Sequence, residues 1–456
     1  MTADEHWSAE QTLLGPGLQS VILASRLCVS NGRGVRLVDL DGKQYLDFFG
    51  AAGVNSLGHA HPRYIRALTE QLDDWVVGAF GSPARLDMVS ELRSVLPPEL
   101  DRVQLYSSGT EAVEAALRLA KSATGGFEFL SFWNAFHGRT MGSLAMSHQA
   151  GHGLGPGPPG FFGAPYADCS RCPFRLSFPE CGFACVEHAR ETVRQDVVGQ
   201  LAAIVVEPVQ GRAGNIAPPP GYLGALRALA DEFGALLIAD ESMTGFGRTG
   251  TMFGFEYDGV APDVAVFGKG MGGGYPVTAV AASAELMSNS PFGDPSANSS
   301  SFGAFPAACR AVATTVQIIR EDGLAQAARG LGGQMIAELR NALADASGVG
   351  GVTGRGLAIG VQLIADRASR QPLDPAGTRA AFLSLAEQGL LVMTGKSCLR
   401  LYPPLTVGAE DCMAAVDILT SVLRLGAGRD RRLRLHRRGQ DRGVPSHRRR
   451  RGPCGG

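Results

Sequence analysis

The middle of the chain alternates short apolar runs with longer amphipathic segments. Six runs have a strand-like composition, and they lie at residues 103–108, 127–133, 201–209, 235–242, 264–268 and 277–283. The first run leads into GTEAVEAALRLAKSA, in which apolar residues recur with the period of an amphipathic helix. Apolar runs separated by helical segments predict a mostly parallel sheet that helices cover on both faces.

Both ends of the chain show a different pattern. Residues 35–49 contain two strand-like runs that meet at an Asp-Gly turn, which predicts a β-hairpin. We expect one helix after Pro62 and another after Pro306. In the C-terminal part, residues 355–364 and 398–405 have the clearest strand character.

This order of elements predicts an α/β fold with two unequal domains. The large domain, with its mostly parallel sheet flanked by helices, is expected at residues 61–310, with a cysteine-rich insertion at 165–186. A smaller α+β domain is expected to combine residues 18–60 with residues 311–427. Residues 428–456 are expected to form a disordered, arginine-rich tail.

The distribution of charge separates this tail from the rest of the chain. Of the 42 basic and 43 acidic residues, eleven arginines and two aspartates lie in residues 429–456, which leaves a net charge of −10 elsewhere. Because the rest of the chain shows no basic face, we expect no nucleic-acid partner. No apolar run approaches the roughly 20 residues that span a bilayer, and the N-terminus lacks a secretory signal. We expect no membrane contact and a cytoplasmic location.

Four of the nine cysteines cluster in the insertion CSRCPFRLSFPECGFAC. Cys169, Cys172, Cys181 and Cys185 have the spacing C-x2-C-x8-C-x3-C, and four thiols in so short a segment are candidate ligands of structural zinc or of an iron–sulfur cluster. The alternatives are a packed loop of reduced cysteines and a pair of loop disulfides, which a cytoplasmic location disfavours. A structural metal and metal-free packing are about equally consistent with the spacing.

Three successive strand-like runs end in ionisable residues. These are Glu207, then Asp240 with Glu241, and then Lys269, which is surrounded by glycines in FGKGMGGGYP. Ligands of open parallel sheets bind at the carboxyl ends of the strands. A lysine and a carboxylate at neighbouring strand ends suit pyridoxal phosphate, because the lysine amine binds the aldehyde and the carboxylate keeps the ring nitrogen protonated. The glycines would leave room beside the lysine.

A phosphate group needs a separate binding site. Residues 107–110 (SSGT) lie at a strand-to-helix junction, where free backbone N–H groups and the helix dipole attract an anion. The segment also fits an ordinary helix cap with a capping-box glutamate. It is not a Walker loop, because the Gly-Lys-Ser/Thr ending is absent. Further along, FHGRT supplies Phe136, an aromatic ring that could lie on a cofactor face or in the core.

Together these residues resemble the class III aminotransferases of the ornithine and 4-aminobutyrate type, a branch of the fold type I pyridoxal phosphate enzymes. The resemblance covers about residues 18–425, and the most specific stretches are ADESMTGFGRTG and FGKGMGGGYPV. It implies that Lys269 binds the cofactor covalently and that Asp240 contacts the ring nitrogen. It also implies that Ser108, Gly109 and Thr110 hold the phosphate.

The same resemblance implies further cofactor contacts. Phe136 should stack on the ring with His137 beside it, and Glu207 should lie near the ring hydroxyl. Ser242 and Met243 replace the valine and glutamine that are common in the family, which makes Met243 a cofactor contact of altered chemistry.

The family is homodimeric, with both active sites at the subunit interface. A threonine of the neighbouring subunit usually reaches the phosphate, and Ser301 stands at that position here. Arg400 matches the arginine that binds the α-carboxylate of the amino donor, a pairing for which guanidinium is well shaped. Arg212 replaces a glutamate that neutralises this arginine in the family. The replacement leaves open a surface residue on the rim or an anionic second substrate.

The resulting expectation is an aminotransferase. It would take an amino group from a donor such as L-glutamate and pass it to a carbonyl acceptor, which the sequence leaves open between a keto acid, a semialdehyde, an aldehyde derived from an amine and a keto sugar. An amino acid racemase or epimerase of the same fold is the first alternative, and a decarboxylating or eliminating lyase is the second. A non-catalytic relative is disfavoured, because the lysine, the aspartate and the phosphate-binding segment are all present.

Overall fold

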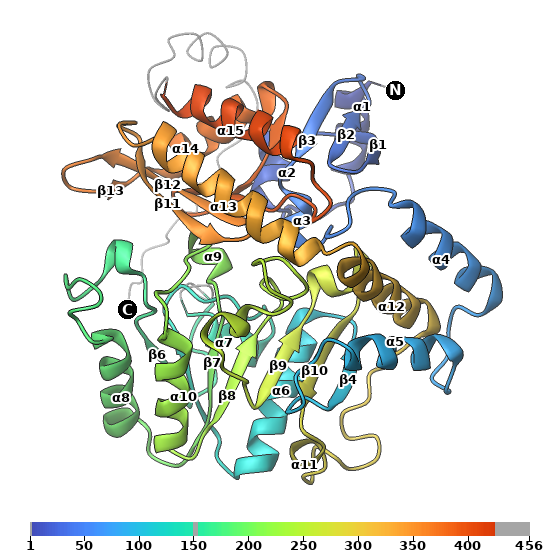
Figure 1. The fold of residues 1–456 in the computed structure, drawn as a ribbon, viewed down its shortest axis with the longest axis vertical. Coiled ribbons are helices and arrows are strands. Elements are labelled where there is room, and N and C mark those ends of the chain that lie inside the picture. The colour runs from blue at the N-terminus through green and yellow to red at the C-terminus, as the bar shows by residue number, and fades with distance from the viewer. Residues whose placement is uncertain (1, 149–153, 425–456) are drawn as a thin grey trace, which may run out of the picture.

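The structure, a computed structural model, describes residues 2–148 and 154–424. Its centre is a seven-stranded sheet with the order β4-β10-β9-β8-β7-β5-β6 (Figure 1). The strands are β4 (Arg102–Tyr106), β10 (Thr278–Ala282), β9 (Val264–Phe267), β8 (Leu236–Asp240), β7 (Leu201–Val206), β5 (Glu128–Phe132) and β6 (Phe161–Ala164). Strand β10 is antiparallel to both neighbours, and the pairs from β9 to β6 are all parallel. The mostly parallel sheet is thus confirmed.

Helices cover both faces of this sheet, as the apolar runs predict. On β7, Ile204 and Val206 pack in one buried cluster with α8 (Ala184–Asp196) and α10 (Tyr222–Glu232). The alternate residues Ala203 and Val205 pack on the other face with α6 (Gly109–Thr124). All six residues of β7 are buried, which is why the strand reads as an unbroken apolar run rather than as an alternating one.

The smaller region combines the two chain ends in two further sheets. One has the order β1-β2-β3-β14, in which β14, from the C-terminal part, lies parallel to β3. The other has the order β11-β12-β16-β15, with β13 paired to β12. The strands are β1 (Val29–Arg33), β2 (Arg36–Asp39), β3 (Gln44–Asp47), β14 (Leu390–Leu391), β11 (Val349–Arg355), β12 (Ala358–Asp366), β16 (Cys398–Leu401), β15 (Met393–Thr394) and β13 (Gln371–Pro372). The predicted hairpin is β2–β3, and a small α+β region built from both ends is confirmed.

Helices surround the smaller sheets and connect them to the large one. Helices α13 (Leu324–Ala342), α14 (Pro375–Glu387) and α15 (Ala409–Arg424) lie over the smaller region in Figure 1. Helix α12 (Pro306–Glu321) packs against α4 (Pro62–Asp74) and α5 (Pro83–Arg93). Helix α12 continues across residue 310, where the predicted large domain ends. The domain boundaries therefore stay a prediction. The short elements are α1 (Ala3–Glu10), α2 (Ser20–Ser25), α3 (Gly50–Gly53), α7 (Met141–Met146), α9 (Gly211–Gly214), α11 (Ala284–Met287), η1 (Cys169–Arg171), η2 (Gly254–Asp258) and η3 (Lys269–Gly272).

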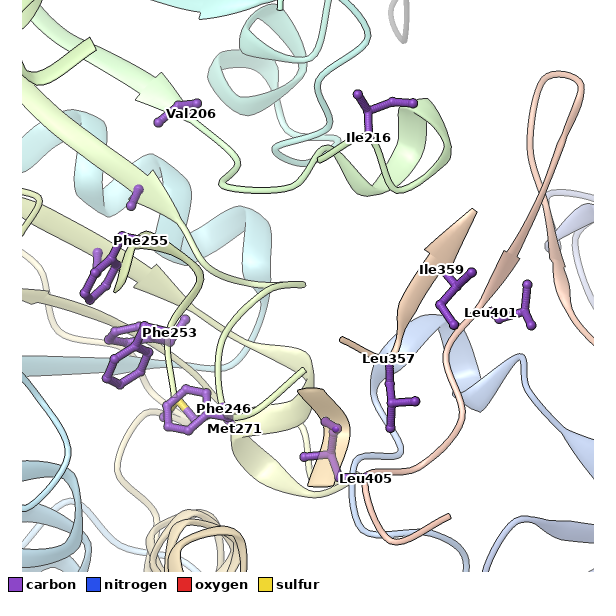
Figure 2. Packing of buried hydrophobic residues seen from close by; sticks show 14 of the residues in the cluster. Val206, Ile216, Phe246, Phe253, Phe255, Met271, Leu357, Ile359, Leu401 and Leu405 are labelled. Atoms are coloured by element: carbon purple, nitrogen blue, oxygen red, sulfur yellow. The ribbon is translucent and has the colours of Figure 1, made fainter. Parts of the chain in front are cut away.

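One buried hydrophobic cluster crosses from the large sheet into the smaller region. Figure 2 shows Phe253 and Met271 of the large part with Leu357, Leu401 and Leu405 of the smaller part, and all five belong to the same cluster. Each is at most 1% exposed. The shared core sets the position of β16 relative to the carboxyl ends of β8 and β9.

The predicted tail at residues 428–456 lies outside the described residues. Among the helices that the structure describes, none is long and apolar enough to cross a membrane.

Candidate active site

Lys269 follows β9 directly and begins the short helix η3. Its φ of 45° lies in the left-handed region, which is uncommon for a residue with a side chain and often marks a functional position. Neighbouring hydrogen bonds hold this backbone, because Ser56 Oγ donates to the Gly270 carbonyl at 2.8 Å and Tyr64 OH donates to the Gly272 carbonyl at 2.6 Å. Gly273 has a φ of 58°, and a Cβ there would lie 2.6 Å from Thr315 Oγ1. At this position the turn therefore requires glycine.

Asp240, the last residue of β8, forms a buried ion pair with His137. Its Oδ2 lies 2.7 Å from His137 Nδ1, and the two side chains are 4% and 0% exposed. Burial alone would raise the pKa of Asp240, but the hydrogen bond and charge of His137 and a bond from Ser242 N–H outweigh it and lower the pKa. Burial would lower the pKa of His137, and Asp240 reverses that shift. The aspartate is therefore held in its charged form.

Glu207 lies just past the end of β7, close to the same pair. Its Oε2 accepts from Phe136 N–H at 3.1 Å, and its Oε1 accepts from Gly211 N–H at 3.3 Å. Burial raises the pKa of this carboxyl to about 7, assisted by Asp240 and opposed by His137 and Lys269. Glu207 thus joins the loop that carries Phe136 to the segment after β7.

The charges of these groups act on Lys269. Desolvation lowers the pKa of its amine, and the nearby charge of Arg400 lowers it further, whereas Asp240 and Glu207 oppose the shift. A lysine whose pKa is depressed by its site is a better base and nucleophile near neutral pH than a solvated one.

Glu241 has a structural role, although it stands beside Asp240 in the sequence. It is fully buried and accepts hydrogen bonds from Thr244 Oγ1 at 2.6 Å and from the N–H groups of Gly254 and Phe255 at 2.9 and 2.8 Å. Burial raises its pKa to about 7. It closes the loop between β8 and η2.

The N-terminus of α6 combines a helix cap with free donors. Ser108 Oγ accepts from Glu111 N–H at 3.3 Å, and Glu111 Oε2 accepts from Ser107 N–H at 3.0 Å, so the capping reading is correct. Within the described chain, however, the N–H groups of Gly109 and Thr110 have no hydrogen-bond partner. An added Cβ at Gly109 would meet no atom within 4 Å. The cap therefore leaves an open pair of donors for an anion.

Phe136 lies on the loop after β5. Two guanidinium groups approach its ring, Arg139 at 5.4 Å and Arg212 at 5.5 Å from the ring centre. Both distances are within the range of cation–π contacts. The aromatic face thus lies in a positively charged part of the site.

Arg400 is buried in the middle of β16 and is 5% exposed. Its Nη1 donates to the Gly211 carbonyl at 3.1 Å, and its Nη2 donates to the Thr394 carbonyl at 3.0 Å. Its Nε is buried without a hydrogen-bond partner among the described residues. Among the described residues, no carboxylate forms a salt bridge with Arg400.

Two of the predicted cofactor contacts lie at the edge of this arrangement. The sulfur of Met243 would be 2.9 Å from a Cβ at Gly53, so the side chain packs against α3. Ser301 is exposed on the surface of this chain. Their contacts with a cofactor stay predictions.

Comparison with known proteins agrees with this geometry. The family model for "Aminotransferase class-III" matches residues 21–423. The chain belongs to the class III aminotransferases. It is 36% identical over 397 residues to an acetylornithine aminotransferase of Methanosarcina acetivorans, with 86% of this chain and 91% of the relative covered.

Two further relatives broaden the comparison. A [LysW]-aminoadipate semialdehyde/glutamate semialdehyde transaminase of Sulfurisphaera tokodaii is 33% identical over 74% of this chain and 82% of its own. The crystal structure of an amine transaminase from an uncultivated Pseudomonas species, in its PLP-bound form, gives a TM-score of 0.83 at 30% identity, with coverage of 90% and 98%.

The chain is thus a class III aminotransferase of PLP fold type I that transfers an amino group from an amino acid to a carbonyl acceptor. The cofactor of this family is pyridoxal phosphate, and the residues present fit it. The two open N–H donors of α6 suit a phosphate, the anionic Asp240 suits a protonated ring nitrogen, and Lys269 supplies the amine.

The four cysteines of the insertion require a correction. Among the described residues, no group of three or more His, Cys, Asp or Glu side chains is arranged to hold a metal ion, so the predicted zinc site is not supported. Cys169, Cys172, Cys181 and Cys185 are free thiols. Burial raises the pKa of Cys169, and that of Cys185 to about 11, so these thiols stay protonated near neutral pH.

Several residues of this site were not identified in the sequence analysis. Arg139 is part of the FHGRT stretch, from which only Phe136 and His137 were expected at the site. Arg248, 2% exposed, donates to the Leu357 and Pro403 carbonyls and so joins the loop after β8 to the smaller region. Its place in the signature ADESMTGFGRTG was the only available signal.

Proposed function

We propose that this aminotransferase uses L-glutamate as its amino donor, with Arg400 binding the α-carboxylate. The observation that carries the proposal is the buried Nε of Arg400, which has no hydrogen-bond partner among the described residues. The other two nitrogens of the guanidinium donate to backbone carbonyls, which hold it in place. An anion is the missing partner of such a group, and the planar guanidinium matches a carboxylate. The charge of Arg400 lowers the pKa of Lys269, which supports a substrate that contacts both residues.

The chain's own residues divide the chemistry among them. Bound pyridoxal phosphate supplies a ring that accepts electrons from the substrate carbon. Asp240, kept anionic by His137 and Ser242, would keep the ring nitrogen protonated. Lys269 would hold the cofactor through its amine and, once free, would take and return the proton of the substrate carbon. Glu207 holds the loop of Phe136, whose ring would lie against the cofactor.

The phosphate is bound by Ser108, Gly109 and Thr110 at the start of α6. Met243 is not among its proposed ligands and packs at the edge of the site. We propose a homodimer in which Ser301 of each chain serves the phosphate of the other, which its exposure in the single chain allows.

The acceptor is proposed to be a keto acid or a semialdehyde. Relatives named for acetylornithine and for glutamate semialdehyde support a carbonyl at the end of a chain that also bears a carboxylate.

The proposal can be tested in two half-reactions. The purified protein should show a visible band that borohydride abolishes, and L-glutamate should remove that band with release of 2-oxoglutarate. Lys269→Ala should bind the cofactor without the covalent link and lose at least about a thousandfold in rate. If an L-amino acid loses its chirality without any acceptor, the enzyme is the racemase rather than the transaminase. Full turnover by Lys269→Ala would refute both.

A further inference from the structure

A cluster of hydroxyl groups joins the start of α6 to the loop that carries Phe136 and His137. Thr110 Oγ1, on α6, lies 2.7 Å from Thr140 Oγ1 and 2.6 Å from Ser143 Oγ. Thr140 ends that loop as the N-cap of α7, and Ser143 lies in the first turn of α7. The hydroxyls therefore connect the segment proposed for the phosphate to the loop of the aromatic ring.

Glu114 is the acidic member of this cluster. It follows Thr110 by one helical turn on α6, so the two side chains lie on one face of the helix. Its Oε1 accepts from Thr140 Oγ1 at 2.6 Å and from Ser143 N–H at 3.0 Å. One carboxylate of α6 thus holds both the N-cap hydroxyl of α7 and a backbone N–H of its first turn, where a helix supplies no carbonyl partner.

The protons available in the cluster explain the importance of Glu114. A carboxylate only accepts hydrogen bonds, so the single hydroxyl proton of Thr140 is directed to Glu114. Thr140 Oγ1 is left as an acceptor for the hydroxyls of Thr110 and Ser143, and Thr140 N–H lies 3.2 Å from both of their oxygens. The hydroxyl of Thr110 is therefore bonded inside the chain. Its N–H, which has no partner among the described residues, is the group that faces an anion.

The loop is held closely at both ends. Gly138 has a φ of 145°, and an added Cβ would lie 2.3 Å from Ser143 Oγ and 2.5 Å from Thr110 Oγ1, so only glycine fits there. At the other end, Glu207 Oε2 accepts from Phe136 N–H at 3.1 Å. Two carboxylates, one after β7 and one on α6, therefore fix the loop between them.

We propose that Glu114 is a positioning residue of the cofactor site, which clamps the loop of Phe136 and His137 to the start of α6 through Thr140 and Ser143. In this role it does not touch the phosphate, because like charges repel. Its effect reaches the cofactor through the ring of Phe136 and through His137. The inference rests on the proposed function, because it adds a residue to the same cofactor site.

The test measures cofactor binding and the cofactor spectrum rather than turnover. The cofactor-free protein is titrated with pyridoxal phosphate, and the visible circular dichroism of the bound cofactor reports how the protein orients its ring. We expect Glu114→Ala to weaken binding about tenfold or more and to change this dichroism, because two hydrogen bonds to α7 are lost. Glu114→Gln should stay within about threefold of the wild-type affinity, because its amide oxygen can accept the same two bonds.

A second substitution tests the route from Glu114 to the loop. Thr140→Val keeps the shape of the side chain and removes the hydroxyl, so it should show part of the same loss even if Glu114→Ala does not fold. The double variant should lose clearly less affinity than the product of the two single losses, since both substitutions break one contact. Glu285→Ala is the matched control, because it removes an exposed carboxylate on α11, a helix that also packs against α6. It should leave affinity and dichroism unchanged.

A purely structural role would lower the free energy of unfolding of Glu114→Ala but leave the cofactor's affinity and dichroism at their wild-type values. That result would overturn the inference, and so would equal losses in Glu114→Ala and Glu114→Gln. Tighter binding by Glu114→Gln would do the same, since the carboxylate would then act by repelling the phosphate.

Failure of this inference is distinct from failure of the proposed function. If L-glutamate leaves the visible band of the wild type unchanged while the variants of Glu114 and Thr140 behave as expected, the donor assignment fails and the clamp stands. If L-glutamate removes the band and Glu114→Ala binds the cofactor as the wild type does, the donor assignment stands and the clamp fails.

Discussion

The buried pair of Asp240 and His137 predicts how the stability of the protein depends on pH. Asp240→Asn keeps the shape of the side chain and one hydrogen bond but removes the negative charge. The surroundings of His137 disfavour its protonated form, and Asp240 is the main group that overcomes them. In the variant, the imidazole should therefore be neutral when folded, with a pKa below the ordinary value of about 6.5.

The pH range of this effect follows from the directions in which folding shifts the pKa values of His137 and Asp240. In the wild type the pKa of His137 is raised, so its contribution to stability is complete below about pH 6.5 and is lost as pH rises through the folded-state value. The pKa of Asp240 is lowered, so its contribution is present above about pH 3.9 and is lost as pH falls through the folded-state value.

At pH 7.5, replacing a charge-assisted hydrogen bond by a neutral one should lower the free energy of unfolding by about 1–2 kcal/mol. Below about pH 6.5, the unfolded variant binds a proton that its folded form does not, which costs up to about 1.4 kcal/mol per pH unit. From pH 7.5 to pH 5 the difference between wild type and variant should thus grow by about 2–3 kcal/mol, since the wild type also gains stability as pH falls from 7.5 to 6.5.

Other titrating groups should largely cancel in this difference. Glu207 feels Asp240 and His137 with opposite signs, and the substitution removes both charges together. Glu241 titrates near the same pH but accepts only from Thr244, Gly254 and Phe255 among its neighbours, which are the same in both proteins.

The assay is urea unfolding of the cofactor-free proteins, followed by circular dichroism at one protein concentration and at several pH values between 7.5 and 5. The cofactor is removed because it stabilises the folded state by binding. The control is a double variant, Asp240→Asn with His137→Asn. Since it has no imidazole to titrate at this position, it should not show the additional loss of unfolding free energy that Asp240→Asn shows at low pH. A difference between wild type and Asp240→Asn that stays constant over this range would refute the reasoning.

Three further predictions concern activity and packing. In Glu207→Gln, the pH profile of kcat/KM should lose an ionisation near the pKa of about 7 that burial gives this carboxyl, and an unchanged profile would exclude its role. Arg248→Ala should leave two buried carbonyls without a donor and lower the free energy of unfolding by about 3 kcal/mol, measured by urea titration. Phe253 is 0% exposed, and Phe253→Ala should lower the free energy of unfolding by about 3–5 kcal/mol. Phe80 is 82% exposed, and Phe80→Ala should change it by about 0.5 kcal/mol or less. Equal effects of the two substitutions would contradict the packing.

The sequence allowed most of the large sheet to be predicted, because burial on both faces produces a composition that is visible without a partner strand. Strand β6 escaped notice, since its four residues, FFGA, follow a Gly- and Pro-rich segment and lie at the sheet edge. Strand β1 was missed for a different reason. Its residues, VSNGR, are mostly exposed and polar, and they form a strand only because they pair with β2.

In the candidate site, the positions of residues at strand ends could be predicted from the sequence, whereas the contacts of loop residues could not. Parallel strands bring Glu207, Asp240 and Lys269 to one edge whatever the loops do. The pairing of His137 with Asp240 depends on a loop 103 positions away, so no local pattern could indicate it. The sequence leaves Arg212 open between a rim residue and a contact of an anionic substrate, because most arginines are solvated, whereas the structure shows that Arg212 lines a cavity together with Arg400. Cysteine spacing could not decide between a metal site and metal-free packing for a related reason, since it reports proximity along the chain and not the arrangement of the sulfurs in space.

The hydrophobic cluster shared by the two parts of the molecule has a consequence for how the enzyme meets its substrates. Leu401 and Leu405, which follow Arg400 in the chain, are packed in the same cluster as Met271, two residues beyond Lys269. Swinging one part away from the other would expose this apolar surface to water. The shared core thus fixes the separation between Arg400 and Lys269, and with the roles proposed for them this separation limits the length of the molecule that can bridge them.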